Sequence, residues 1–256
     1  MIHALKTKWK VYLMEAFCLG LFMISASVFA TVLEYPNSII HQLLPNVFTR
    51  LVIMGIAMGI TATLLNYSPM GRLSGAHMNP AVTFTFVRLT KIKLVDAIYY
   101  VLFQCLGGIA GVVLMSTLVP DSFRDPHVNY IITAPGKFGV GVAFAIEVLM
   151  AFGMMMMVLT TSNHPRYAKY TGLIAGMFVA SFVILSAPIS GFSINPARTI
   201  ASAIPGMQFP SFWIYMTAPF IGMLGAAEVF TLFNGKAICA KMHHVDTYLC
   251  IFNCGY

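Results

Sequence analysis

The stretch that decides the fold occurs twice, as Ser74-Gly75-Ala76-His77-Met78-Asn79-Pro80-Ala81 and as Ser190-Gly191-Phe192-Ser193-Ile194-Asn195-Pro196-Ala197. Both copies read Ser-Gly, three variable residues and Asn-Pro-Ala. Asn is a preferred helix N-cap and Pro is favoured at the first helical position, so each copy predicts a loop that turns directly into a helix. The apolar segments that follow, 82–87 and 199–204, are too short to cross a membrane.

The composition is that of an integral membrane protein. Of the 256 residues, 59% are hydrophobic and 9% are charged, and the mean hydropathy is +0.82. Soluble domains contain about 25% charged residues. The formal charge of +7 comes from scattered Lys and Arg residues beside apolar runs, which indicates contact with a lipid bilayer and not with nucleic acid. We expect a single transmembrane domain over residues 1–256.

Six apolar runs are long enough for a helix that crosses the hydrocarbon core, which takes about 20 residues. We predict them near 11–33, 47–66, 95–118, 138–161, 168–187 and 211–233. The two Asn-Pro-Ala motifs follow the second and fifth runs. The predicted fold is an all-α membrane protein with six transmembrane helices and two re-entrant half-helices.

The two halves of the chain repeat each other. Asn195 follows Asn79 by 116 positions, and Glu15 in the first run has a counterpart, Glu147, in the fourth. The repeats cover about 11–118 and 138–233 and leave a tail of about 234–256. Three spans per half is an odd number, so the second half must enter the bilayer upside down, which makes an inverted repeat.

Lys and Arg residues predict the orientation, because they are enriched in cytoplasmic loops. Most of them fall on the side of the two termini, at Lys6, Lys8, Lys10, Arg72, Arg88, Lys91, Lys93, Arg166, Lys169, Lys236 and Lys241. We therefore expect a multi-pass protein of the cell membrane with both termini, and the tail, in the cytoplasm.

Inversion would bring the N-termini of the two half-helices together near the middle of the bilayer. Each N-terminus carries about half a positive charge, and the amides of Asn79 and Asn195 offer N–H donors to a passing oxygen. Cations, hydronium included, would meet a barrier there, whereas neutral hydrogen-bonding molecules would pass. Pro80, Ala81, Pro196 and Ala197 complete the two motifs.

The residues before each Asn leave backbone carbonyls without helical partners, and these can replace part of a solute's hydration. We expect such carbonyls to line the pore at Gly75, Ala76, His77, Gly191 and Ser193. The His77 side chain is interpreted as a pore-lining donor, with gating by its protonation as the alternative.

Three charged residues lie in apolar surroundings. Arg198 is a candidate for a pore constriction, and a snorkelling interfacial arginine is the alternative. Val82 holds the corresponding position of the first copy, so the copies are not equivalent. Glu15 and Glu147 are interpreted as structural acceptors for N–H groups of the re-entrant loops; a proton relay is the alternative.

The tail contains atoms that can bind metals, in Cys239, His243, His244, Cys250 and Cys254. We interpret it as a solvated segment without ligand function, and we expect neither a metal nor a cofactor. The chain also shows no nucleophile–base pair, so an enzyme is not expected.

These residues resemble the aquaporin and aquaglyceroporin family, also called major intrinsic proteins. The resemblance covers about residues 11–233 and is closest around the two Asn-Pro-Ala motifs, Arg198, and the Glu of the first and fourth spans. It implies a homotetramer with one pore per protomer, passive conduction and exclusion of protons. It also implies a selectivity filter of Arg198, Phe192, Val183 and a position on the second span, either Gly59 or Met58.

The chain departs from the strictly water-selective pattern of that family. Its fifth span contains no His, and Phe192 is similar to what glycerol facilitators have, although Thr199 replaces the Asp that usually follows their arginine. We expect conduction of water with small uncharged solutes such as glycerol. The alternatives are a glycerol or small neutral solute facilitator with low water flux and, from another class, a proton- or ion-coupled transporter.

Overall fold

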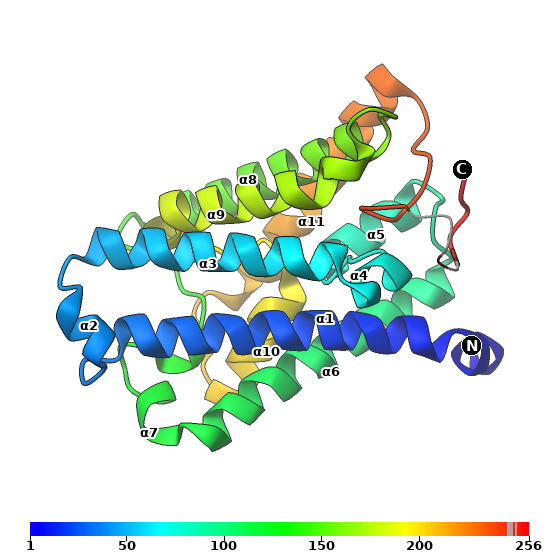
Figure 1. Ribbon diagram of the computed structural model, residues 1–256. Coiled ribbons are helices and arrows are strands. Elements are labelled where there is room, and N and C mark those ends of the chain that lie inside the picture. Colours follow the sequence, from blue (N-terminus) through cyan, green and yellow to red (C-terminus); the bar gives the residue numbers. More distant parts are fainter. Residues whose placement is uncertain (245–247, 249, 256) are drawn as a thin grey trace.

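The computed structural model describes residues 1–244, 248 and 250–255. Among these residues, six helices are long and apolar enough to cross a membrane, which confirms the predicted all-α membrane fold. They are α1 (Ile2–Glu34), α3 (Val47–Tyr67), α6 (Leu94–Leu118), α8 (Gly139–Ser162), α9 (Thr171–Ser190) and α11 (Phe212–Asn234) (Figure 1). Helix α1 begins well before the predicted span, and Lys8 in its extension forms an ion pair of 2.7 Å with Asp96 of α6.

Two short helices begin at the Asn-Pro-Ala motifs, α5 (Pro80–Arg88) and α10 (Pro196–Gly206). With nine and eleven residues they total the length of a single span, about 30 Å at 1.5 Å per residue. The other short elements are α2 (Ile39–Leu43), α4 (Pro69–Ser74), α7 (Pro120–Phe123) and the 3₁₀ turns Asn129–Ile131 and Ala168–Tyr170.

Equivalent helices of the two halves pack in the same way. Helix α1 packs on α6, and α8 packs on α11. In both pairs a glycine touches the backbone of the partner: a Cβ added to Gly107 would overlap the carbonyl oxygen of Ala16, and one added to Gly222 would overlap that of Val148. The same close crossing in each half is what an inverted repeat predicts.

Both chain termini lie at one end of the helix bundle, opposite α2 and α7 (Figure 1). We call this the terminal end. The described part of the tail, residues 235–244, 248 and 250–255, folds back there onto the bundle. Its Met242 N donates to Gly75 O (3.2 Å), and its Asn253 N donates to Lys91 O (2.9 Å). Ala240, Lys241 and Phe252 are buried, so the predicted solvated tail is wrong.

Candidate functional site: a cavity at the half-helix junction

The two loops before the half-helices have the same unusual backbone. Gly75 and Gly191 end the preceding helices with φ of 94° and 79°, a left-handed conformation that glycine adopts without strain. Two further residues of each loop, at equivalent positions, also have positive φ: Ala76 (56°), Met78 (49°), Phe192 (46°) and Ile194 (44°). The alternation leaves each loop without a repeating backbone ladder, so its N–H groups need other acceptors.

A buried carboxylate from a long helix accepts these N–H groups. Glu15 of α1 accepts from His77 N (3.1 Å) and Met78 N (2.7 Å). Glu147 of α8 accepts from Ser193 N (3.0 Å) and Ile194 N (2.6 Å). This is the contact geometry that a structural role for the two glutamates requires.

Two further side-chain pairs, which the sequence reasoning missed, support both loops. Tyr100 donates to Ser74 O and Tyr215 donates to Ser190 O, each at 2.6 Å. In addition, Thr83 contacts His77 Nδ1 (3.1 Å) and Thr199 contacts Ser193 Oγ (2.6 Å). The available signal was the spacing of the repeat, since both pairs recur after 115 or 116 positions.

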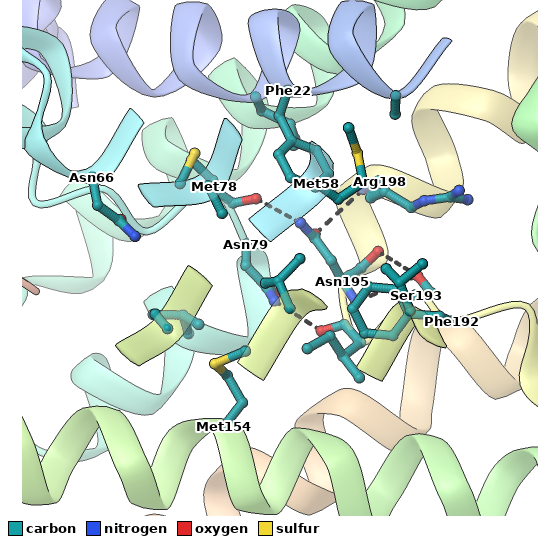
Figure 2. Close-up of a pocket in the computed structure, with 18 of the residues that line it drawn as sticks. Phe22, Met58, Asn66, Met78, Asn79, Met154, Phe192, Ser193, Asn195 and Arg198 are labelled. Atoms are coloured by element: carbon teal, nitrogen blue, oxygen red, sulfur yellow. Dashed lines mark hydrogen bonds between the residues drawn. The ribbon is translucent and has the colours of Figure 1, made fainter. Parts of the chain in front are cut away.

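The two asparagines hold each other's loop (Figure 2). Asn79 Nδ2 donates to Ile194 O at 2.8 Å, and Asn195 Nδ2 donates to Met78 O at 2.7 Å. Each Oδ1 caps its own half-helix, Asn79 by accepting from Ala81 N (2.9 Å) and Asn195 by accepting from Ala197 N (3.0 Å). An amide nitrogen carries two hydrogens, so one donor of each asparagine remains for another acceptor.

A cavity of about 220 Å³ passes these asparagines. Its polar lining residues are Asn66, His77, Asn79, Ser193, Asn195 and Arg198, and its other described lining residues are apolar or glycine. Figure 2 shows Asn66 and Arg198 at opposite sides of the site with the asparagines between them. Arg198 Nη1 is buried and makes no hydrogen bond to the described residues. The walls are therefore apolar with a few N–H donors along the path.

Arg198 shares the cavity with three of the expected filter residues, Phe192, Val183 and Met58. The expectation for Gly59 is corrected: a Cβ added there would lie 2.6 Å from Gly176 O and 2.8 Å from Ala180 Cβ, so this residue faces α9. The alternative register, with Met58 at the cavity, fits the structure.

The expected carbonyl lining is corrected in the first loop. His77, Gly191 and Ser193 line the cavity, but Gly75 and Ala76 do not. The carbonyl of Gly75 accepts from Met242 N of the tail. The tail therefore makes the hydrogen bond to the Gly75 carbonyl that was expected from a solute.

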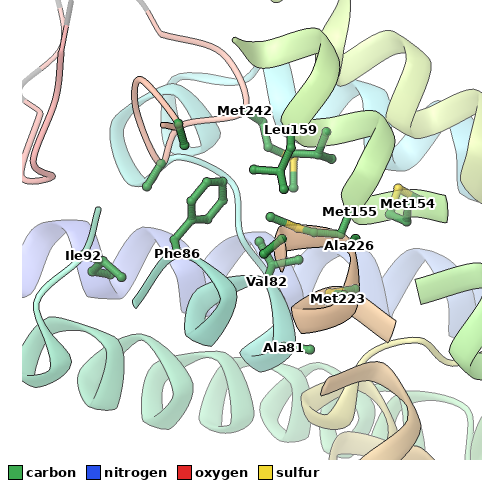
Figure 3. Packing of buried hydrophobic residues seen from close by; sticks show 14 of the residues in the cluster. Ala81, Val82, Phe86, Ile92, Met154, Met155, Leu159, Met223, Ala226 and Met242 are labelled. Carbon is green, nitrogen blue, oxygen red and sulfur yellow. The ribbon is translucent and has the colours of Figure 1, made fainter. Parts of the chain in front are cut away.

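The tail also covers His77. His77 Nε2 lies 2.8 Å from Ala240 O, and the imidazole stacks between Phe86 and Phe252, with ring centroids at 5.2 Å and 5.5 Å. Met242 lines the cavity. Met242 of the tail and Leu159 of α8 belong to the same buried hydrophobic cluster (Figure 3). The terminal end of the cavity is thus walled by the tail.

Glu228 of α11 forms a bidentate ion pair with Arg88 at the end of α5. Its Oε1 and Oε2 lie 2.8 Å from Arg88 Nε and 3.0 Å from Arg88 Nη2. The pair is solvent-exposed and lies outside the cavity.

Known proteins are similar to this chain in sequence and in fold. The family model described as major intrinsic protein matches residues 3–230. A glycerol uptake facilitator protein-like 6 of Lactiplantibacillus plantarum is 34% identical, over 68% of this chain and 81% of its own. Aquaporin NIP2-3 of Zea mays is also 34% identical, over 69% of this chain and 56% of its own.

The fold resembles the X-ray structure of the aquaglyceroporin from Plasmodium falciparum. The TM-score is 0.71 over 86% of this chain and 94% of that chain, at 18% sequence identity. This chain therefore has the same fold as that protein. Because the family model covers the membrane helices and both half-helices, this chain belongs to the major intrinsic protein family.

Proposed function

We propose that this protein is a passive transmembrane channel that conducts water and small uncharged solutes such as glycerol and excludes protons and ions. Its family consists of transport proteins and not of enzymes. Relatives named as a glycerol uptake facilitator and as an aquaporin support both kinds of permeant.

The observation that carries the proposal is the pair of crossed asparagines. Asn79 and Asn195 each have one amide hydrogen fixed by the opposite loop, which aims the second at a permeant. Both also cap a half-helix whose N-terminus carries a partial positive charge. A water molecule there would accept hydrogen bonds, and a cation would be repelled.

The proposed filter is Arg198, Phe192, Val183 and Met58. Arg198 supplies N–H donors, and the other three supply apolar surface. A polyol presents hydroxyl oxygens on one side and C–H groups on the other, so it matches a wall of this kind. This composition supports glycerol as a permeant in addition to water.

A facilitator with low water flux is the second candidate, since Phe192 and the glycerol facilitator relative favour it. A coupled transporter is disfavoured because the groups at the half-helix junction are neutral amides. Coupling to protons or ions takes a titratable or ion-binding group at that place.

Stopped-flow light scattering on proteoliposomes tests the proposal. An osmotic jump with sucrose should shrink them several-fold faster than empty liposomes, and a jump with glycerol should add rapid re-swelling. Fast glycerol entry with water entry at the rate of empty liposomes would select the low-water facilitator. No acceleration with either solute, in chelator-treated wild type and in the tail variant C250S/C254S alike, would refute a channel.

A matched pair of variants assigns the filter. Phe192→Ala should raise glycerol permeability relative to water several-fold, because it removes a ring from the cavity wall. Phe209→Ala removes the same ring from an exposed position and should leave the ratio unchanged. Equal ratios in both variants would place Phe192 outside the constriction.

We further propose that the protein lies in the cell membrane with both termini cytoplasmic, as one channel domain per chain, and assembles as a homotetramer. The Lys and Arg residues on the side of the termini support this orientation. The tetramer rests on the family resemblance. Native mass spectrometry of the purified protein should give four chains, and a monomer under conditions that preserve flux would contradict it.

A further inference from the structure

Four side chains of the tail that can bind a metal lie close together. Cys239, His244, Cys250 and Cys254 each place one ligand atom so that all four lie within 4.8 Å of one another. We call them the tail cluster. All four residues are described by the structure, and they lie beyond the family match, which ends at residue 230. The cluster is therefore not accounted for by the channel function.

The distances inside the tail cluster fit a tetrahedral metal site. Cys239 Sγ and Cys250 Sγ are 3.7 Å apart, and Cys254 Sγ lies 3.2 Å from His244 Nε2. A tetrahedral zinc ion with Zn–S of about 2.3 Å and Zn–N of about 2.0 Å separates two sulfurs by about 3.8 Å, and a sulfur and a nitrogen by about 3.5 Å. A disulfide would instead bring two sulfurs to about 2.0 Å.

We propose that Cys239, His244, Cys250 and Cys254 bind one Zn²⁺ in a closed Cys₃His site. Soft thiolates with one imidazole select zinc over magnesium or calcium, which prefer oxygen ligands. Four protein ligands leave no open position, which is typical of a structural zinc site and not of a catalytic one. Binding displaces the thiol protons, so the site needs reduced cysteines.

Hydrogen bonds around the tail cluster indicate a structural role for a bound zinc ion. The backbone closes around the tail cluster where Gly255 N donates to Ile238 O (2.9 Å), and Ile238 N donates to Asn163 Oδ1 of the loop after α8. On the other side, Asn253 Nδ2 donates to Thr90 O (2.7 Å). Zinc would link the stretch around Ile238, which binds the loop after α8, to the stretch around Asn253, which binds Thr90.

The site also bears on the cavity, a step that rests on the proposed function. Cys239 and His244 flank the segment that contains Ala240 and Met242. Ala240 O contacts His77 Nε2, and Met242 lines the cavity. A metal that fixes both flanks would hold this segment over the cytoplasmic mouth, so that zinc binding lowers the flux.

The first test measures zinc in the purified full-length protein. The reduced protein is dialysed against Zn²⁺ and then against metal-free buffer, and the zinc per chain is measured by mass spectrometry. Wild type should retain one zinc per chain, and C250S/C254S should lose it. Cys105→Ser removes a thiol of α6 that lies outside the tail cluster and should retain the zinc.

Cobalt reports the geometry independently of channel activity and of stability. Reduced wild type should take up Co²⁺ with the absorption bands of a tetrahedral thiolate complex, and Zn²⁺ should displace them. Wild type without zinc retention, or C250S/C254S with undiminished retention, would overturn the site. A Cys239–Cys250 disulfide whose reduction restores no metal binding would overturn it as well.

The second test compares water flux in zinc-loaded and chelator-treated proteoliposomes. Chelation should raise the flux of wild type several-fold and leave C250S/C254S, already fast, unchanged. Zinc retention with unchanged flux would overturn the effect on the mouth and leave the metal site. Absence of flux in every sample, C250S/C254S included, would contradict the channel and leave the zinc result standing.

Discussion

At the scale of single residues, each half-helix asparagine uses its whole side chain. Its oxygen caps a helix, one hydrogen binds the opposite loop, and the second is free for a permeant. The pairing explains why Asn occupies both positions, because Asp lacks the donors and Ser lacks the second hydrogen.

Sequence identified Asn79, Asn195 and Arg198 as candidates, because motif spacing and an arginine in an apolar run are visible in the chain. It did not decide between Gly59 and Met58. Adjacent helix positions differ by about 100° in direction, and the small Gly59 is needed at the contact with α9. That contact depends on the fold and not on local sequence.

Glu147→Gln should destabilise the protein by about 2 kcal/mol. The carboxylate accepts from Ser193 N, Ile194 N and the Ser190 hydroxyl, and an amide would turn a donor toward one of these donors. Glu228→Gln is the matched control, since its exposed ion pair contributes about 0–1 kcal/mol. Thermal unfolding in detergent should show a clearly larger loss for Glu147→Gln, and equal losses would argue against the structural role.

At the scale of elements, the long and short helices could be predicted more fully than the loops between them. Apolar run length and the Asn-Pro start are local signals, and they gave all six spans and both half-helices. The loop backbone could not be predicted, because Ala76, Met78, Phe192 and Ile194 adopt a left-handed conformation that such residues rarely take. Buried acceptors from distant helices, Glu15 and Glu147, hold that conformation.

Helix crossing gives a prediction for a glycine pair on α11. Gly222→Ala should destabilise the protein by about 1–3 kcal/mol, because its Cβ would overlap Val148 O and lie 2.8 Å from Phe152 N. Gly225→Ala should be neutral or stabilising by up to about 1 kcal/mol, because its Cβ would lie 3.7 Å from the Phe152 ring and alanine favours helix. Unfolding temperatures that fall equally would contradict the close α8–α11 contact.

At the scale of the whole molecule, the two halves hold their re-entrant loops by the same contacts, and they differ in that the tail packs on the first loop. Glutamate, tyrosine and asparagine contacts recur in both halves. Among the described residues, the glycine carbonyl of the first loop accepts from Met242 N of the tail, and that of the second loop has no such contact. Sequence did not predict this docking, because the tail is short and mixed in composition and its partners in the bundle lie 75 to 169 positions away.

Met242→Ala should test the tail as part of the mouth without touching the zinc ligands. It removes a side chain that lines the cavity, so water flux in zinc-loaded liposomes should rise while zinc retention stays at one per chain. Met207→Ala, at an exposed position of the loop after α10, is the control and should change neither. Unchanged flux in Met242→Ala would mean that Met242 does not restrict the path.

The central claim is a pore that passes water and stops protons at the crossed asparagines. Its most direct test measures both fluxes in the same proteoliposomes, with light scattering for water and an enclosed pH-sensitive dye for protons, using chelator-treated wild type and C250S/C254S. Water flux should exceed that of empty liposomes several-fold, while proton flux equals theirs. Water flux at the level of empty liposomes in both samples, or proton entry that rises with water flux, would contradict the account.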